Sequence, residues 1–420
     1  MTEREARRRQ AVGRAEAKRR DGMTVLCAAN HYDGIKLADQ HMAEHLSALG
    51  PVLYVDPPLS WLTPLRAAHT AQSLNGPRLR VLAPNLARLT PVVQPGPARL
   101  GLVSLTSVLA RRHLRHATSA LGGQVRAVVS AWPLFPVFGS CDERLRVYWA
   151  QDDFVAGAAL LRMDRRQLDR QERRVAAAAD RIVAANPVVA DTWRERGFDP
   201  ALIPYGADVD AYAAVDQAPP PPDVYIDPPI VGFVGQLNDR TDLRLLEAVA
   251  DRDRSLLLVG PVNPSFEPRR FDDLRQRRNV CWVGPKPFDA LPGYLRLIDV
   301  GIVPYRDSAF NRGSFPLKTL EYLAAGRAVA STDLPAIRWL DTDLVASASE
   351  PGAFADLVDR MLATGRTPAD LMQRQTFAAR HSWARRAAEL HELISSTPLT
   401  RPHTQAPPAC GVHVQGHCFW

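Results

Sequence analysis

Continuously apolar runs alternate with helical stretches along the first half of the chain. The runs that predict strands are 23–29, 51–56, 79–84, 127–132, 146–150, 181–186 and 201–206. Helices are expected between them, at about 36–49, 99–120, 164–180 and 187–196. Because these strand runs are apolar throughout rather than alternating, they predict strands buried on both faces, as in a parallel sheet covered by helices.

A proline-rich stretch, "QAPPPPDVYIDPP" (217–229), divides the chain, because it can neither continue a helix nor complete a sheet ladder. Beyond it the alternation restarts, with strand runs at 230–235, 256–260, 280–284, 300–305, 328–332 and 344–349 and helices over 368–396. We predict an α/β protein of two doubly wound, Rossmann-like domains that face a cleft. The expected boundaries are 23–212 for the N-terminal domain, 213–229 for the linker and 230–396 for the C-terminal domain with its closing helix.

The charge distribution changes this picture only at the N-terminus. Net charge is +7, and residues 1–22 hold eight Arg or Lys and four Asp or Glu, so this stretch supplies four of those charges. We interpret it as a basic flexible leader; contact with anionic lipid is the alternative. No part of the chain interleaves aromatic with basic residues, so we expect no nucleic-acid partner.

The chain contains no run of about 18 uncharged apolar residues, and the leader lacks the apolar core of a signal peptide. Five scattered cysteines show no framework spacing, which indicates reduced thiols and a cytoplasmic location. The final stretch, 397–420, has no periodicity and is expected to be disordered. Its Cys410, His413, His417 and Cys418 are a conceivable zinc set, but adjacent His417 and Cys418 fit no closed site well.

The segment "NRGSFPLKTLEYLAAGRAVAST" (311–332) carries the chemistry. Ser314 can cap a helix and Pro316 suits its first turn, which places both at the carboxyl edge of the sheet. Free N–H groups and the helix dipole favour an anion there. Lys318 in the first turn would oppose that dipole unless a phosphate lies above it, and Arg312 could serve the same anion.

Glu321 lies three residues after Lys318 and permits two interpretations. A surface ion pair at this spacing would contribute only a few tenths of a kcal/mol. Alternatively, both side chains face a ligand, with Glu321 accepting hydrogen bonds from hydroxyl groups. Two observations favour the second interpretation. A cation in the first turn of a helix opposes the helix dipole, and the rest of this helix is too apolar for a solvated surface.

"FPLKTLEYLAAGRAVAST" resembles the donor-site helix of GT-B-fold, family-4-like glycosyltransferases, in particular their teichuronic-acid-biosynthesis subgroup. Four other segments resemble pieces of that family in the same order: 148–157 with its Tyr-x3-Asp-Asp pattern, 201–212, 232–250 and 279–305. The resemblance covers about 23–390 and is strongest in the C-terminal half. It implies a GT-B architecture in which the N-terminal domain takes the acceptor and the C-terminal domain takes a nucleotide-sugar donor.

By this resemblance Glu321 would bind the ribose, while Lys318, Arg312 and the amides of Ser314 and Phe315 would hold the diphosphate. Gly284 to Phe288, with Lys286, would line the base pocket, and Gly235 lies in the glycine-bearing loop. The implied reaction is transfer to a hydroxyl acceptor with retention, needing neither cofactor nor metal. One departure is clear, because Gly313 stands where the wider family has its first glutamate. Of that family's basic pair after "GFVG", only Arg240 is nearby.

On the acceptor side, Asp152 and Asp153 follow a strand and could deprotonate an acceptor hydroxyl; a helix N-cap is the alternative for either. His31 and Gly34, after the first strand, could approach the diphosphate or be ordinary loop residues. Residues 99–116 form a basic amphipathic stretch that could contact the inner face of a membrane carrying a lipid-linked acceptor, or simply pack on the core. Alternative functions are a nucleotide-sugar epimerase or hydrolase and a non-catalytic partner protein.

Overall fold

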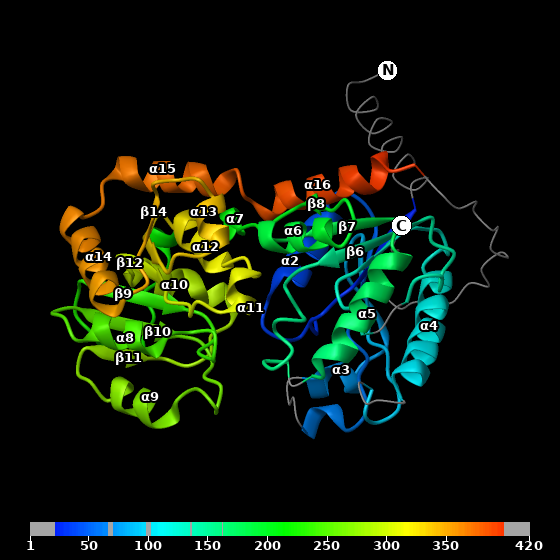
Figure 1. Cartoon of the computed structure of the whole chain (residues 1–420), viewed down its shortest axis with the longest axis horizontal. Coiled ribbons are helices and arrows are strands. Elements are labelled where there is room, and N and C mark those ends of the chain that lie inside the picture. The colour runs from blue at the N-terminus through cyan, green and yellow to red at the C-terminus, as the bar shows by residue number, and fades with distance from the viewer. Residues whose placement is uncertain (1–21, 66–69, 98–101, 135–136, 162, 399–420) are drawn as a thin grey trace, which may run out of the picture.

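The computed structural model describes residues 22–65, 70–97, 102–134, 137–161 and 163–398. Two α/β domains lie side by side, the N-terminal domain on the right of Figure 1 and the C-terminal domain on the left. The predicted fold class, two doubly wound domains, is confirmed. The leader and the tail lie outside the described residues, except for Gly22, Thr397 and Pro398.

An eight-stranded sheet forms the N-terminal domain, in the order β3-β4-β2-β1-β5-β6-β7-β8. Its strands are β1 (Met23–Cys27), β2 (Val52–Val55), β3 (Leu79–Ala83), β4 (Leu86–Leu89), β5 (Val125–Ser130), β6 (Leu145–Ala150), β7 (Arg181–Ala184) and β8 (Ala201–Leu202). The helices are α2 (Ala38–Ser47), η1 (Thr63–Leu65), α3 (Ala71–Asn75), α4 (Val103–Ala120), α5 (Arg165–Ala178) and α6 (Pro187–Glu195). The next two, α7 (Val209–Tyr212) and η3 (Val215–Gln217), already pack on the C-terminal domain. Central strands such as β1 and β2 are buried along their whole length, as their apolar runs predict.

One edge of this sheet departs from the prediction of parallel strands. β3 pairs antiparallel with β4, a strand that the sequence analysis did not predict. The two form a hairpin whose turn contains Asn85 with a φ of 66°, a left-handed conformation that asparagine tolerates. β3 is half-buried or exposed along its length, so it does not share the two-sided burial that marks the parallel strands.

A six-stranded sheet, entirely parallel, forms the C-terminal domain in the order β11-β10-β9-β12-β13-β14. Its strands are β9 (Ile230–Val234), β10 (Ser255–Val259), β11 (Val280–Trp282), β12 (Val300–Val303), β13 (Ala328–Ser331) and β14 (Val345–Ser347). Its helices are α8 (Leu243–Ala250), α9 (Pro268–Arg275), η4 (Phe288–Ala290), α10 (Leu291–Leu297), α11 (Ala309–Arg312), α12 (Leu317–Ala324), α13 (Pro335–Trp339), α14 (Pro351–Thr364) and α15 (Pro368–Ala379).

The chain crosses between the domains twice, and the two crossings touch. The first leaves the N-terminal domain after Ala207, and the second returns through Ser382 into α16 (Trp383–Ser396). Ala207 accepts a hydrogen bond from the Trp383 N–H and donates its own N–H to His381. α16 then packs on α2 of the N-terminal domain (Figure 1). The closing helix therefore belongs by packing to the N-terminal domain, not to the C-terminal domain in which the sequence placed it.

Candidate functional site

The segment between β12 and α12 forms the C-terminal side of the site. We expected Ser314 to cap α12, but that helix begins after Pro316, which occupies the N-cap position without a side-chain cap. Ser314 instead accepts a hydrogen bond from Arg240 (2.9 Å) and donates its N–H to the Asn311 carbonyl (3.3 Å). The capping prediction is wrong, and the Ser314 amide is already engaged. No backbone acceptor for the Phe315 N–H is found among the described residues, and this residue lies just before the start of α12.

Lys318 and Glu321 lie together on α12. The Lys318 Nζ is 2.7 Å from a Glu321 carboxylate oxygen, so the ion pair that the spacing permits is formed. Its setting is not that of an ordinary surface pair, because the Glu321 side chain is 6% exposed and the Lys318 side chain 24%. A buried carboxylate with a partly exposed ammonium at a helix N-terminus can still accept from hydroxyl groups and neutralise an anion.

Arg240 is a functional candidate whose role the sequence alone does not indicate. It lies in the loop after β9, where its Nε donates to Asn311 (2.9 Å) and its terminal nitrogen to Ser314 (2.9 Å). Its guanidinium stacks over the rings of Tyr305 and Phe310, at 4.9 and 5.0 Å from the ring centroids. Hydrogen bonds and rings hold this cation in one orientation. The available signal was its position as the basic residue in the glycine-bearing loop.

Asp152 faces this cation from the N-terminal domain. One of its carboxylate oxygens is buried without a hydrogen-bond partner among the described residues. Burial raises the pKa of Asp152 to about 6, although the charge of Arg240 and the hydroxyl of Ser314 act in the opposite direction. A carboxyl group with such a pKa can exchange a proton near neutral pH, which suits a general base.

Asp153 makes a direct contact across the domains. Its N–H donates to the Gly313 carbonyl (3.3 Å), and its carboxylate accepts the Ala156 N–H (2.9 Å), capping a turn. A Cβ at position 313 would lie 2.7 Å from the Asp153 Cβ, so any residue other than glycine would force the domains apart here. The predicted cleft is therefore closed at this point. The departure at Gly313 has a physical cause, because the Asp153 Cβ occupies the space that a side chain at position 313 would need.

The remaining predicted site residues have other partners. Arg312 is exposed and paired with Asp307 at 2.5 Å, and Lys286 is paired with Asp223 of the linker at 2.5 Å. Neither contacts the Lys318–Glu321 pair. In the loop before α2, the Gly34 N–H donates to the His31 carbonyl, forming a turn.

The predicted loop glycines occupy the carboxyl ends of β9 and β11. The Gly235 N–H donates to Val259 (2.9 Å), and the Gly284 carbonyl accepts from the Gly260 N–H (2.9 Å). These bonds fix the loop that leads to Arg240. Of the predicted donor residues, the structure thus gathers Ser314, Phe315, Lys318 and Glu321 on one side, and it places Arg312 and Lys286 elsewhere.

Comparisons with known proteins agree with this architecture. Residues 228–364 match the family described as Glycosyl transferases group 1. TuaH of Bacillus subtilis (strain 168), whose name assigns it to teichuronic acid biosynthesis as a glycosyltransferase, is 38% identical over 108 residues, 25% of this chain and 27% of the relative. D-inositol 3-phosphate glycosyltransferase of Corynebacterium urealyticum is 26% identical over 246 residues, 52% of this chain and 56% of that relative. The chain thus matches about a quarter to about half of the length of these relatives.

Solved structures resemble nearly the whole chain. Sucrose-phosphate synthase from Thermosynechococcus elongatus has a TM-score of 0.66 at 17% identity, covering 89% of this chain and 98% of that one. HepE of Anabaena, in complex with UDP and glucose, has a TM-score of 0.62 at 13% identity, covering 90% and 100%. The fold of the chain is therefore the GT-B fold of glycosyltransferases. Within it, residues 228–364 match the group 1 glycosyl transferases, which confirms the resemblance found in the sequence.

Proposed function

We propose that the protein is a glycosyltransferase that moves a sugar from a nucleotide-diphosphate sugar to a hydroxyl acceptor. The observation that carries this proposal is the set of cations and carboxylates that lies at the domain junction. Lys318 and Glu321 lie at the start of α12, and Arg240 lies beside Ser314. Asp152 faces Arg240 and Ser314 from the other domain. A nucleotide diphosphate needs cations for its phosphates and an acceptor for its ribose hydroxyls, and this edge supplies both.

The donor would lie against the C-terminal domain. Lys318 and Arg240 would hold the diphosphate together with the free Phe315 N–H at the helix start, and Glu321 would accept from the ribose. The matched domain (228–364) contains all four residues, and HepE, a protein of the same fold, has been solved with UDP and glucose. The ion pair of Lys318 with Glu321 keeps the lysine oriented until the donor arrives.

The reaction breaks the bond from the anomeric carbon to the diphosphate and forms one to the acceptor oxygen. Lys318 and Arg240 offset the negative charge that grows on the leaving diphosphate, so the proposal needs no metal for the transfer step. Retention is expected from the resemblance, with the acceptor proton passing to a donor phosphate oxygen. Asp152, with a pKa of about 6, is the chain's own candidate to take that proton instead.

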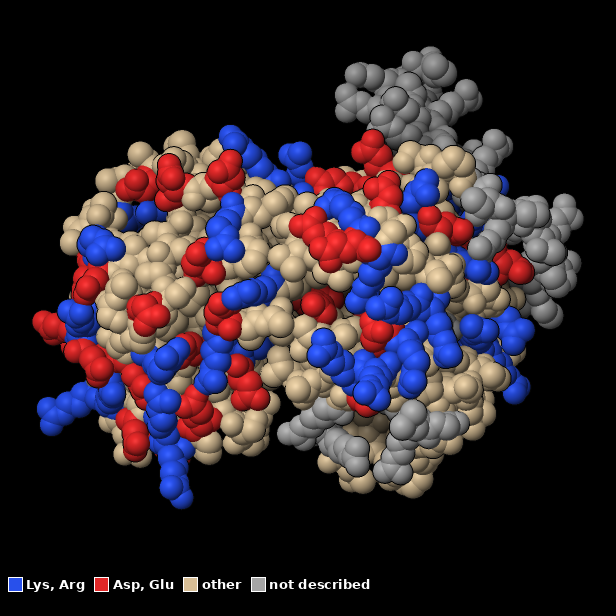
Figure 2. Space-filling model, in the orientation of Figure 1, with Lys and Arg blue, Asp and Glu red and all other residues tan. Residues whose placement is uncertain are grey.

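For the acceptor we propose a lipid-linked hydroxyl compound presented at an anionic membrane surface. Leu105 and Val108, 46% and 60% exposed, share one face of α4 with the exposed Arg112 and Arg115. Arginines of α5 form a second basic band on the same domain (Figure 2). Apolar side chains among basic ones are typical of helices that lie on anionic membranes. None of the described helices is both long and apolar enough to cross a bilayer.

The activity is tested by incubating the full chain with a panel of nucleotide sugars and hydroxyl acceptors, in the presence of excess chelator. We expect transfer with retention at the anomeric carbon and release of the nucleoside diphosphate. An inverted product would overturn the mechanism. Loss of transfer with chelator that Mg²⁺ or Mn²⁺ restores would overturn its metal independence. Donor hydrolysis or epimerisation without transfer would instead identify the alternative enzymes, and absence of any donor turnover would indicate a non-catalytic partner.

Membrane contact is tested by sedimentation with vesicles of anionic and of neutral lipids. We expect binding to the anionic vesicles only, and a loss of that binding when Leu105 and Val108 are both changed to glutamate. Equal binding of the variant and the original chain would contradict a contact through α4. Met372→Glu is the control, because it places a glutamate at an exposed apolar position on the C-terminal domain, away from α4. Its binding to the vesicles should be unchanged.

A further inference from the structure

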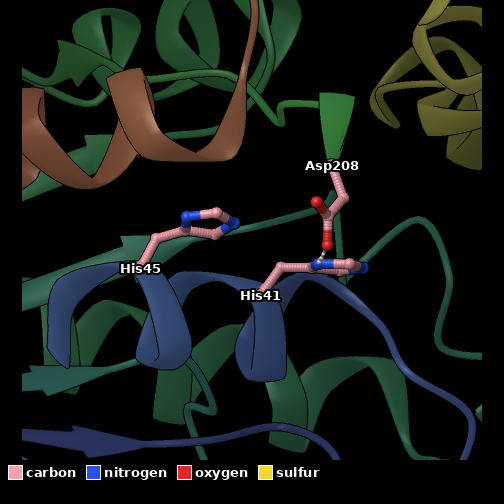
Figure 3. Close-up of side chains that lie close together, drawn as sticks. All are labelled: His41, His45 and Asp208. Carbon is pink, nitrogen blue, oxygen red and sulfur yellow. Dashed lines mark ion pairs between the residues drawn. The ribbon is translucent and has the colours of Figure 1, made fainter. Parts of the chain in front are cut away.

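Three metal-ligating side chains converge where the two domain crossings meet. His41 and His45 lie one turn apart on α2, and the Asp208 carboxylate points toward them from the first crossing (Figure 3). One potential ligand atom of each lies within 4.8 Å of the others. The His-x3-His spacing places two imidazoles on one face of a helix, and the third group comes from a distant part of the chain.

The environment of His41 indicates that a partner is missing. Its side chain is 1% exposed, and neither ring nitrogen has a hydrogen-bond partner among the described residues. The nearest Asp208 oxygen is 3.7 Å from the His41 Nδ1, beyond hydrogen-bond distance. A buried polar group without a partner costs free energy, so such groups are rare unless an ion or water satisfies them.

We infer that His41, His45 and Asp208 bind a divalent cation of the zinc type. Two imidazoles and one carboxylate suit Zn²⁺ or Co²⁺ and are poor ligands for Mg²⁺, which prefers oxygen. With ligand bonds of about 2.0–2.1 Å, tetrahedral ligand atoms lie about 3.3 Å apart. The three groups therefore need to move inward by about an ångström, which rotation of the partly exposed His45 and Asp208 side chains can supply. A water molecule would complete the coordination.

Two neighbouring cations compete with the metal. The Lys36 Nζ lies 3.8 Å from an Asp208 oxygen, but it also pairs with Glu44 at 2.7 Å, so it keeps a partner when the metal takes Asp208. Lys318 is close enough to act on His41 electrostatically from the C-terminal domain. The Phe288 and Trp383 rings cover the remaining sides of His41, at 5.2 and 5.5 Å between ring centroids.

The position of the cluster gives the metal a structural role. Asp208 directly follows Ala207, which is hydrogen-bonded to the second crossing, and Trp383 of that crossing stacks on His41. A bound ion would join α2 directly to the first crossing, which is hydrogen-bonded to the second, and would so restrain the hinge between the domains. This inference is independent of the proposed activity, because a metal here stabilises the pivot and takes no part in the transfer.

The test uses Co²⁺ as a spectroscopic probe for Zn²⁺ on the full chain, beginning from protein stripped by a chelator. We expect one equivalent to bind, with d–d absorption of tetrahedral type and without thiolate charge-transfer bands. Zn²⁺ should displace the Co²⁺ and raise the melting temperature by about 5 °C at a large excess over its dissociation constant. His45→Ala and Asp208→Asn should each weaken binding by about tenfold or more.

Two controls keep the result interpretable. His116→Ala changes an exposed histidine on α4 and should leave binding and melting temperature unchanged. Joint Cys410→Ser and Cys418→Ser changes remove the thiols of the C-terminal tail, and binding should persist. Equal Co²⁺ binding by His45→Ala and the original chain, loss of binding in the cysteine variant, or no binding at all would each overturn the inference. His45 is only partly buried, so we expect the His45→Ala protein to fold. An unchanged circular-dichroism spectrum checks this.

Discussion

The two sides of the domain junction are built in different ways. On the C-terminal side, Lys318 and Glu321 come from one turn of α12, and their partnership is local. On the N-terminal side, Asp152 and Asp153 have their partners in the other domain, at Arg240, Ser314 and Gly313. One half of the site can thus be read from a short stretch of sequence. The other half exists only when the two domains meet.

The difference explains why the C-terminal edge can bind an anion without contributions from the N-terminal domain. Arg240 is held by Asn311, Ser314 and two aromatic rings, all from its own domain, so this edge can bind an anion whatever the other domain does. Asp152 depends on closure for its burial and its neighbouring cation. We therefore expect changes on the C-terminal edge to alter donor binding, and changes on the N-terminal edge to alter turnover.

The largest effect is expected from Arg240→Ala. The change removes a charge-assisted contact to the donor and leaves Asp152 buried without its cation, so kcat/KM should fall roughly 100-fold. Steady-state kinetics and nucleoside diphosphate titration measure the loss. Arg244→Ala is the matched control, because that arginine lies four residues further on, in α8, where its side chain is 63% exposed and pairs with Asp242. Equal losses in both variants would contradict a site role for Arg240.

Gly313→Ala tests the contact between the domains. The added Cβ meets the Asp153 Cβ, so the junction should open slightly and kcat should fall about tenfold, while nucleotide affinity changes little. Asp153→Gly removes the opposing Cβ and should restore much of the activity in the double variant. Gly352→Ala, at a position with open space, is the control. Additive losses without rescue would show that the contact is not the cause.

The sequence predicted most elements of both sheets because parallel buried strands are continuous apolar runs, as in β1 and β9. It missed β4, which is also buried along its length, because Arg88 interrupts the apolar run of that strand and finds its ion-pair partners in Asp33 and Asp56. The α12 motif located Lys318 and Glu321, since both roles depend on local spacing. The sequence could not show that Arg312 forms an ion pair with Asp307, or that Lys286 forms one with Asp223 of the linker. The roles of Gly313 and of the His41 cluster depend on contacts where the domains meet, and the role of Arg240 depends on Asn311 and Ser314, which are distant in the sequence. Spacing along the chain encodes none of these contacts.

Lys318 and Arg312 should contribute very differently to nucleoside diphosphate affinity, although the sequence alone could not rank them. Lys318→Ala removes a partly buried cation at the helix start and should weaken nucleoside diphosphate binding by about tenfold. Arg312→Ala removes an exposed cation that is already paired with Asp307, and affinity should change by less than about twofold. Isothermal titration of both variants with the same nucleotide measures the contrast. If Arg312→Ala weakened binding as much as Lys318→Ala, the surface ion pair would have to open toward the donor.

The smallest expected effect is on the free energy of unfolding. It concerns Asp152 of the N-terminal edge, whose contribution to stability should depend on pH. Its pKa is raised from 3.8 to about 6, so the folded protein binds this proton more tightly than the unfolded chain. The resulting stability is present below pH 3.8 and is lost as the pH rises to about 6; above that, the ionised carboxylate opposes folding. Asp152→Asn should therefore stabilise the protein by about 1 kcal/mol at pH 8 and leave it unchanged at pH 4.

Denaturant unfolding at the two pH values measures this difference, and the pH profile of kcat/KM supplies the functional arm. In the original chain the profile should rise with a midpoint near the pKa of about 6, and Asp152→Asn should lower activity and remove that rise. A variant that is more stable at pH 8 yet less active would mean that the buried charge is retained for function at the expense of stability. If the variant were instead less stable at pH 8, the carboxylate would be a structural partner of Arg240, and both sides of the junction would serve binding alone.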